Sequence, residues 1–185
     1  MNTVENVSAA APAAGGAIYV APTGTTLPTS VSAELDAAFK SLGYVSEDGV
    51  TNNNTPSTDV VKAWGGDEVL RPNANKEDTF RYTLIEIMNL DVLKEVFGAD
   101  NVSGTLATGI SITANDDEME EHIVVIDMIL RDNALKRIVI PRAKVTAVSE
   151  ITYSETGAVG YGLTISAAKD SSGNRHYEYI KSAST

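Results

Sequence analysis

Only one of the two histidines in the chain lies near residues that could hold a metal ion. His122 directly follows the run DDEMEE at 116–121, which places five carboxylates in six positions. Clustered carboxylate oxygens are the ligands that Ca²⁺ and Mg²⁺ prefer. However, the run lacks the D-x-D-x-D-G spacing of a calcium-binding loop. A solvated loop before a buried strand is the favoured interpretation, and we expect neither a metal site nor a cofactor.

The residues that commonly act as nucleophiles form no recognisable catalytic motif. Serine and threonine are abundant, but the G-x-S-x-G pattern does not occur. The P-loop and the G-x-G-x-x-G phosphate-binding pattern are absent as well. The sequence has no cysteine, which excludes disulfides, thiolate metal ligands and cysteine nucleophiles.

Asp127 is the residue that most resembles a buried catalytic acid, because it interrupts an otherwise apolar strand. The alternatives are a solvent-facing position or an ion pair with Arg131 or Arg137. An enzyme would need a second acid, for instance Glu86, and no residue spacing supports that pair. We therefore expect that the protein is not an enzyme.

Composition points to a globular protein without affinity for nucleic acid. The 185 residues fit one domain, and 43% hydrophobic with 21% charged residues is ordinary for a folded chain. The formal charge of −11 repels a phosphate backbone. No stretch reaches the roughly 20 apolar residues of a membrane span. The first residues lack the basic and apolar regions of a signal peptide.

Periodicity in the N-terminal half predicts few core elements. Residues 17–20 form a short β-like run, and 32–42 show a helical apolar face with Ser32 as N-cap. Residues 51–58 are polar loop, and 59–64 with 68–70 read as a hairpin around a tight turn. Trp64 beside this turn could be a ligand platform or an aromatic anchor at a subunit contact. The whole excursion 47–78 is too polar for a core and too long for a simple connection, which is typical of functional loops.

The C-terminal half reads as strands with one clear helix. Residues 79–88 alternate, and a helix follows over 90–97, capped near Asn89 and ended by Gly98, with an apolar face of Leu90, Leu93, Val96 and Phe97. Further strands are predicted at 109–113, 123–130, 135–141, 144–153, 159–167 and 176–180. We therefore expect a mainly β fold with a minor α part: a β-sandwich or barrel with a flanking helix and a long extended loop.

Several segments, in this order, resemble one protein family. They are GAIYVAPTGTTLPTS, FKSLGYVSEDGV, VVKAWGGDEVL, FRYTLIEIMNLDVLKEVFGADNV and YGLTISAAKDSSGNRHYEYI. Together they are similar to the tail tube (major tail) proteins of long, non-contractile-tailed bacteriophages, over about residues 15–180.

The resemblance implies a structural virion protein. Subunits would form six-membered rings with a shared inner β-barrel, and the rings would stack into a tube through which DNA is ejected. The partners would be other copies of the chain, a tail-tip or baseplate initiator, a tape measure protein and a tail terminator, with DNA only in transit. The protein would be made in the host cytoplasm and reside in the virion tail. An acidic lumen would lower friction for DNA, in keeping with the net charge.

The same resemblance assigns roles to segments. Residues 1–16 would be a flexible N-terminal arm, 17–180 a single domain and 181–185 a C-terminal tail. Within the domain, 47–78 would be the inter-ring loop and 90–97 the outer helix. The contacts between subunits or rings are expected at Asn52, Asn53, Asn54, Val61, Trp64, Asp67, Glu68 and Arg71.

Two other interpretations remain open at this stage. One is a monomeric β-sandwich binding module of adhesin or carbohydrate-binding type, which the lone tryptophan and threonine-rich loops would suit. The other is a related tube from a contractile tail, a secretion apparatus or a gene transfer particle, which would share the fold and the mechanism.

Overall fold

The computed structural model describes residues 3–13, 16–56, 60–71 and 77–183. The described chain is mainly β, as the sequence predicts, and contains one α-helix, α1 (Leu90–Phe97). The short helical turns are η1 (Val4–Asn6), η2 (Ala99–Asn101) and η3 (Arg131–Asn133). No helix in these ranges has the length and apolar character needed to cross a membrane.

One large antiparallel sheet contains most of the strands. Its order is β3-β2-β10-β11-β12-β7-β4, with β1 also paired to β10 and β13 also paired to β11. The strands are β1 (Ala11–Pro12), β2 (Ile18–Pro22), β3 (Lys40–Ser41), β4 (Thr51–Thr55), β7 (Glu77–Leu84), β10 (His122–Ile129), β11 (Leu135–Val148), β12 (Tyr161–Ala167) and β13 (Tyr177–Lys181). Two separate hairpins join β5 (Val61–Lys62) to β6 (Glu68–Leu70) and β8 (Val102–Thr105) to β9 (Gly109–Ile112).

The long strand β11 lets this sheet fold over on itself. Its first half pairs with β13, and its second half, from Ala143, pairs with β12. Between them, Val124 faces Ile140 while His122 faces Ala143, so β11 carries an extra residue beside Pro141. Such a bulge bends a strand and is one of the few places where a sheet tolerates proline. We call β1, β2, β3, β10, β13 and the first half of β11 the first half-sheet, and the second half of β11 with β12, β7 and β4 the second half-sheet.

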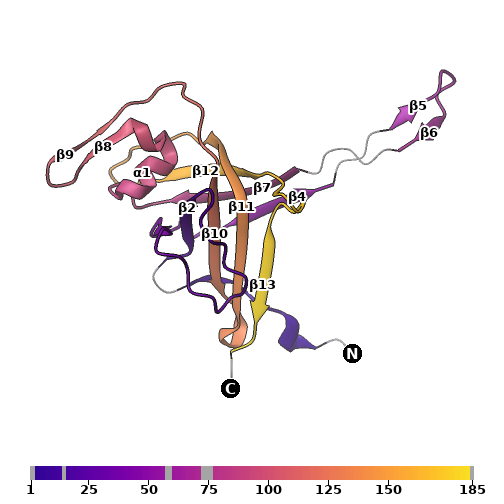
Figure 1. Cartoon of the computed structure of the whole chain (residues 1–185), viewed down its shortest axis with the longest axis horizontal. Coiled ribbons are helices and arrows are strands. Elements are labelled where there is room, and N and C mark those ends of the chain that lie inside the picture. Colours follow the sequence, from indigo (N-terminus) through magenta and orange to yellow (C-terminus); the bar gives the residue numbers. More distant parts are fainter. Residues whose placement is uncertain (1–2, 14–15, 57–59, 72–76, 184–185) are drawn as a thin grey trace.

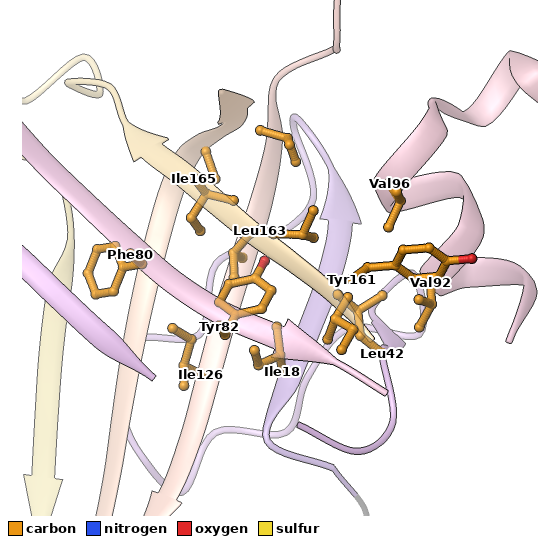
Figure 2. Close-up of a cluster of buried hydrophobic side chains, with 14 of the residues drawn as sticks. Ile18, Leu42, Phe80, Tyr82, Val92, Val96, Ile126, Tyr161, Leu163 and Ile165 are labelled. Carbon is orange, nitrogen blue, oxygen red and sulfur yellow. The ribbon is translucent and has the colours of Figure 1, made fainter. Parts of the chain in front are cut away.

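The two half-sheets enclose one hydrophobic core. Phe80, Tyr82 and Leu163 of the second half-sheet pack in one cluster with Ile18 and Ile126 of the first. Figure 2 shows these side chains between the strands, and Figure 1 shows β7 and β12 crossing β10 and β11 at a steep angle. The alternation predicted at Phe80, Tyr82 and Leu84 is confirmed, because all three are buried. The strand predicted at 79–88 ends at Leu84, however, and residues 85–88 lead into the helix without strand structure.

Helix α1 covers one end of this core, as its local signals predict. The Asn89 side chain accepts the Asp91 N–H at 3.0 Å, and the Gly98 N–H donates to Lys94 O at 2.9 Å. These two caps satisfy backbone groups that an isolated helix would leave unpaired. Leu93 and Val96 are buried in the core, and Figure 2 shows Val96 above Tyr161 of β12.

The helix predicted at 32–42 is wrong. This segment is irregular: the Phe39 N–H donates to Asp36 O, and Asp36 Oδ1 accepts the Ala38 N–H at 2.9 Å. Its last residues, Lys40–Ser41, form β3 on β2. The periodic apolar residues divide between two clusters, with Phe39 packed outside the first half-sheet and Leu42 in the main core. Tertiary contacts therefore outweigh a weak helical preference.

Three strand predictions also need correction. The polar run predicted as loop at 51–58 contains β4 at Thr51–Thr55, which pairs with β7 through backbone hydrogen bonds that polar side chains do not prevent. The strands predicted separately at 135–141 and 144–153 are one strand ending at Val148, because the bulge carries the chain past Pro141. A second bulge between Val145 and Ala147 breaks the alternation expected there, so Ala147 is exposed. The partner of 109–112, β8, was not foreseen.

Candidate assembly surfaces

The described residues of the excursion 47–78 extend away from the sandwich as an arm. Strands β4 and β7 pair from Thr51↔Arg81 to Thr55↔Glu77, and beyond them lies the β5–β6 hairpin (Figure 1). The hairpin predicted from the sequence is confirmed where the structure describes it; its expected start, Asp59, lies outside the described residues. The turn is closed by Ala63 N–H to Asp67 O and by Gly66 N–H to Ala63 O, both at 2.8 Å.

The arm tip, residues 60–71, exposes an unusual set of apolar side chains. Trp64 is fully exposed, with a relative accessibility of 106%. The other exposed large apolar side chains of the tip are Val60, Val61, Val69 and Leu70. A two-stranded hairpin in water is at best marginally stable by itself, and a concentrated apolar patch marks a surface that another molecule covers.

Polar residues of the arm tip bind one another rather than the body. Arg71 forms an ion pair with Glu68, with Nε to Oε2 at 2.9 Å. Lys62 faces Glu68 across the hairpin, and the Asp67 backbone closes its turn. These residues shape the tip, and the two apolar residues among the predicted contacts, Val61 and Trp64, are both exposed on it.

The root of the arm is fixed to the sandwich through Asp78, which the sequence interpretation missed. Asp78 is almost fully buried; Oδ1 accepts Asn52 Nδ2 at 2.9 Å and Oδ2 lies 2.5 Å from His176 Nδ1. The His176 ring packs edge-on against Phe80. Of the predicted contact residues, Asn52 thus holds the root, whereas Asn53 and Asn54 are exposed on β4. The signal was available: an acidic residue on the apolar face of a strand needs a partner.

Strand β4 is an open edge of the large sheet. It pairs with β7 on one side and, among the described residues, with no strand on the other. All five of its residues are exposed. Open edges invite pairing with another chain, so β4 is a second candidate contact surface.

The residues named for the helix are not available as contacts. Leu93 and Val96 are buried in the core, and Leu90 and Phe97 pack against it in part. Phe97 meets Tyr161 edge-on, with ring centroids 5.8 Å apart. These side chains position the helix and do not present a binding surface.

The described part of the N-terminal segment contacts the body. Strand β1 pairs with the end of β10, and the Arg131 N–H donates to Ser8 Oγ at 2.7 Å. The Arg131 side chain also donates to Val4 O at 2.9 Å. Residues 1–2 and 14–15 of the predicted arm, and 184–185 of the predicted tail, lie outside the described residues.

The carboxylates of Asp127 and Glu86 are both held by hydrogen bonds within the subunit. Arg137 holds Asp127 with two hydrogen bonds of 2.7 Å and also donates to the carbonyls of Ser30 and Ala33. One of the two partners expected for Asp127 is therefore confirmed. Glu86, the other residue of the hypothetical acid pair, accepts the Tyr44 N–H and the Asn89 amide, each at 3.0 Å. Both carboxylates are occupied in holding the fold.

A second buried pair joins α1 to the start of β10. His122 Nε2 lies 2.9 Å from Glu95 Oε1. Burial alone lowers the pKa of His122, but the hydrogen bond to Glu95, its charge and the Glu120 carbonyl outweigh this, so the pKa is raised. Burial and the Glu95 charge raise the pKa of Tyr82 well above its ordinary value.

The acidic run 116–121 is a loop before strand β10, as predicted. Glu118 binds Lys144, and Glu121 accepts two hydrogen bonds from Arg142 at 2.8 and 2.9 Å. Each cation lowers the pKa of its partner carboxyl. Within the described ranges, no group of three or more potential ligand side chains could hold a metal ion.

One comparison with known proteins identifies the family of the chain. The family model described as phage tail tube protein matches residues 3–185, which is nearly the entire chain. Comparison with curated proteins finds no match.

Proposed function

The chain belongs to the phage tail tube protein family, and from this premise we propose that it assembles into stacked six-membered rings that form the conduit for DNA ejection. A member of this family is a structural component of the virion tail that self-assembles into a tube. The ring number, the conduit and the contacts between subunits are the proposal. Residues 17–180 would act as one tube-forming domain.

The exposed arm tip is the observation that carries the proposal. Burying the side chain of a valine, leucine or larger apolar residue stabilises a complex by about 1.5–3 kcal/mol. The five apolar side chains of the tip are exposed, Trp64 fully and the others in part. A copy in the next ring is the cover that a repeating tube supplies, and a head-to-tail contact of this kind continues as a filament.

Open sheet edges support closure of the ring. Strand β4 has a free edge, and β10 pairs with β11 only as far as Ala143, so the following part of β11 has no strand beside it on that side among the described residues. These are the two ends of the second half-sheet. Joining them between neighbours would remove both edges and continue the sheet around the ring.

The proposal also includes the other components of the tail and the DNA. The tail-tip or baseplate initiator, the tape measure protein and the tail terminator would meet the tube at its ends and in its lumen. DNA would be a passing partner, because the acidic chain gives it no general affinity. Synthesis in the host cytoplasm would precede assembly.

The test replaces residues 60–71 with a short Gly-Ser linker. Wild-type protein, with purified tail tips as seeds where needed, should give hollow tubes by negative-stain electron microscopy. The variant should stay folded by circular dichroism and form no tubes. Normal tubes from the variant would refute the role of the arm tip. A wild-type monomer that never polymerises, even when seeded, would instead favour a monomeric binding module.

A further inference from the structure

The two half-sheets differ in what covers their outer faces. Leu27, Leu35 and Phe39, in the segment after β2, pack with Ile123 and Val125 of β10 on the outer side of the first half-sheet. Arg137, on the same side, is tied to the carbonyls of that segment. The centre of the first half-sheet, around β10 and the first half of β11, is therefore buried on both faces.

The outer face of the second half-sheet is open and consists largely of uncharged polar residues. Cross-strand partners lie on the same side of a sheet, so the register identifies which residues share this face. Two rows of four residues cross the strands β4, β7, β12 and β11: Thr51, Arg81, Thr164 and Ala147 in one, and Asn53, Thr79, Ser166 and Lys144 in the next. Two shorter rows lie beyond them, Thr55 with Glu77 at one end of the face and Thr83 with Gly162 at the other. We call these residues the hydroxyl face. All of them are exposed or half-buried.

Few charges interrupt the hydroxyl face. Its charged residues are Glu77, Arg81 and Lys144, and Lys144 is paired with Glu118. Arg81 is exposed and has no ion pair within the described residues. The other nine residues of the hydroxyl face are threonine, serine, asparagine, alanine or glycine.

One end of the hydroxyl face is acidic. A shallow depression beside Thr83 is lined by Glu47, Asp48 and Glu150. Gly160 also lines it, which places the depression next to β12. The acids thus lie at one end of the face and not across it.

We infer that the hydroxyl face lines the lumen of the tube and is the surface along which double-stranded DNA passes. This inference rests on the proposed function. DNA binds proteins mainly through phosphates held by Lys and Arg, and a wall with one unpaired cation per subunit offers little to hold. Hydroxyl and amide groups keep the channel wet, whereas apolar walls close channels by dewetting.

The location of the arm agrees with this placement. Strands β4 and β7 form part of the hydroxyl face and lead directly into the arm, and their half-sheet has an open edge at β4 and another along β11 after Ala143. A sheet that continues from subunit to subunit presents one face inward all around the ring. The acidic residues at the end of the face would then form a collar in each ring, while the wall between collars is nearly neutral.

The absence of cysteine permits a direct test by thiol labelling. Ser166→Cys and Thr164→Cys place one thiol on the hydroxyl face, and Thr29→Cys places one on the exposed segment that covers the first half-sheet. Each variant is treated with a small maleimide and with a maleimide carrying a large polymer, first as free subunit and then as tube. Tube formation is checked by electron microscopy before labelling.

The inference predicts that free subunits of all three variants react with both reagents. In tubes, Ser166→Cys and Thr164→Cys should react with the small reagent and lose at least tenfold of their labelling by the polymer reagent. Full polymer labelling in tubes would place the face outside and overturn the inference. Loss of both labels in tubes would place the hydroxyl face in a subunit contact and overturn the inference. Failure of the near-isosteric Ser166→Cys to assemble, when wild type does, would have the same meaning. Absence of tubes from wild-type protein would instead count against the proposed function.

Discussion

Replacing Trp64 with alanine separates the stability of the subunit from the stability of the tube. The Trp64 side chain is fully exposed and contacts nothing that its removal would disturb. Surface substitutions of this kind change the free energy of unfolding by about 0.5 kcal/mol at most. The isolated Trp64→Ala subunit should therefore unfold at the same urea concentration as wild type.

The effect on assembly should be far larger. An aromatic anchor buried at the centre of a contact contributes about 2–4 kcal/mol when truncated to alanine. Since about 1.4 kcal/mol corresponds to a factor of ten in affinity, each inter-ring contact should weaken by about 30-fold or more. Several such contacts act together in a ring, so elongation should fail at concentrations where wild type forms tubes.

The assay is the critical concentration for tube growth, measured by pelleting and light scattering with seeds of fixed number. Trp64→Phe is the matched control, because it keeps an aromatic ring at the same position and should recover most of the growth. A Trp64→Ala protein that elongates at the wild-type critical concentration would refute the reasoning. A variant that unfolds more easily would show that Trp64 supports the subunit instead.

Three other predictions concern the subunit. Gly43→Ala should destabilise the subunit by about 2–4 kcal/mol in urea unfolding, because φ at Gly43 is +71° and a Cβ would lie 2.0 Å from Cδ of Glu86, where it would displace two hydrogen bonds. Gly49→Ala is the control: φ is +69° but the space around it is open, so the cost should be only about 1–2 kcal/mol. Equal losses in the two variants would contradict this account. Arg137→Ala should cost about 3–5 kcal/mol, because it leaves half-buried Asp127 without its partner. Arg142→Ala, in an exposed ion pair, should cost much less, and a small loss for both variants would show that Asp127 is solvated. Because the pKa of His122 is raised above its ordinary 6.5, its stabilising pair with Glu95 is fully present below pH 6.5 and is lost as the pH rises through the raised value. The urea midpoint should fall between pH 6 and pH 8.5 and should fall less in His122→Gln; an unchanged slope in the variant would assign the pH dependence to other groups.

Local sequence signals were sufficient where the structure depends on neighbouring residues. The helix at 90–97 combines a capping Asn89, an apolar face and a terminating Gly98, and all three act within one or two turns. The β5–β6 hairpin likewise follows from a Gly-Gly turn between short apolar runs. The resemblance carried by the ordered segments agrees with the family match over residues 3–185.

Elements that depend on residues distant in the sequence could not be predicted from local sequence signals. The segment 32–42 has a helical pattern, but its apolar residues enter two clusters, and its Ala33 carbonyl accepts a hydrogen bond from Arg137, far along the chain. Strand β4 has no apolar residue to identify it; it exists because β7 supplies its hydrogen bonds. Asp78 and His176 lie far apart in sequence, and only the fold brings them together at the root of the arm.

The sequence alone determined that the protein is mainly β, that it carries one capped helix and a polar excursion, and that it lacks catalytic motifs. These properties follow from residue type and short-range periodicity. The tertiary structure decided which strands face outward, because an extra residue beside Pro141 turns β11 from one half-sheet into the other. Across that bulge the core-facing side chains of β11 change from Ile138 and Ile140 to Ala143 and Val145, so that both half-sheets contribute to one core.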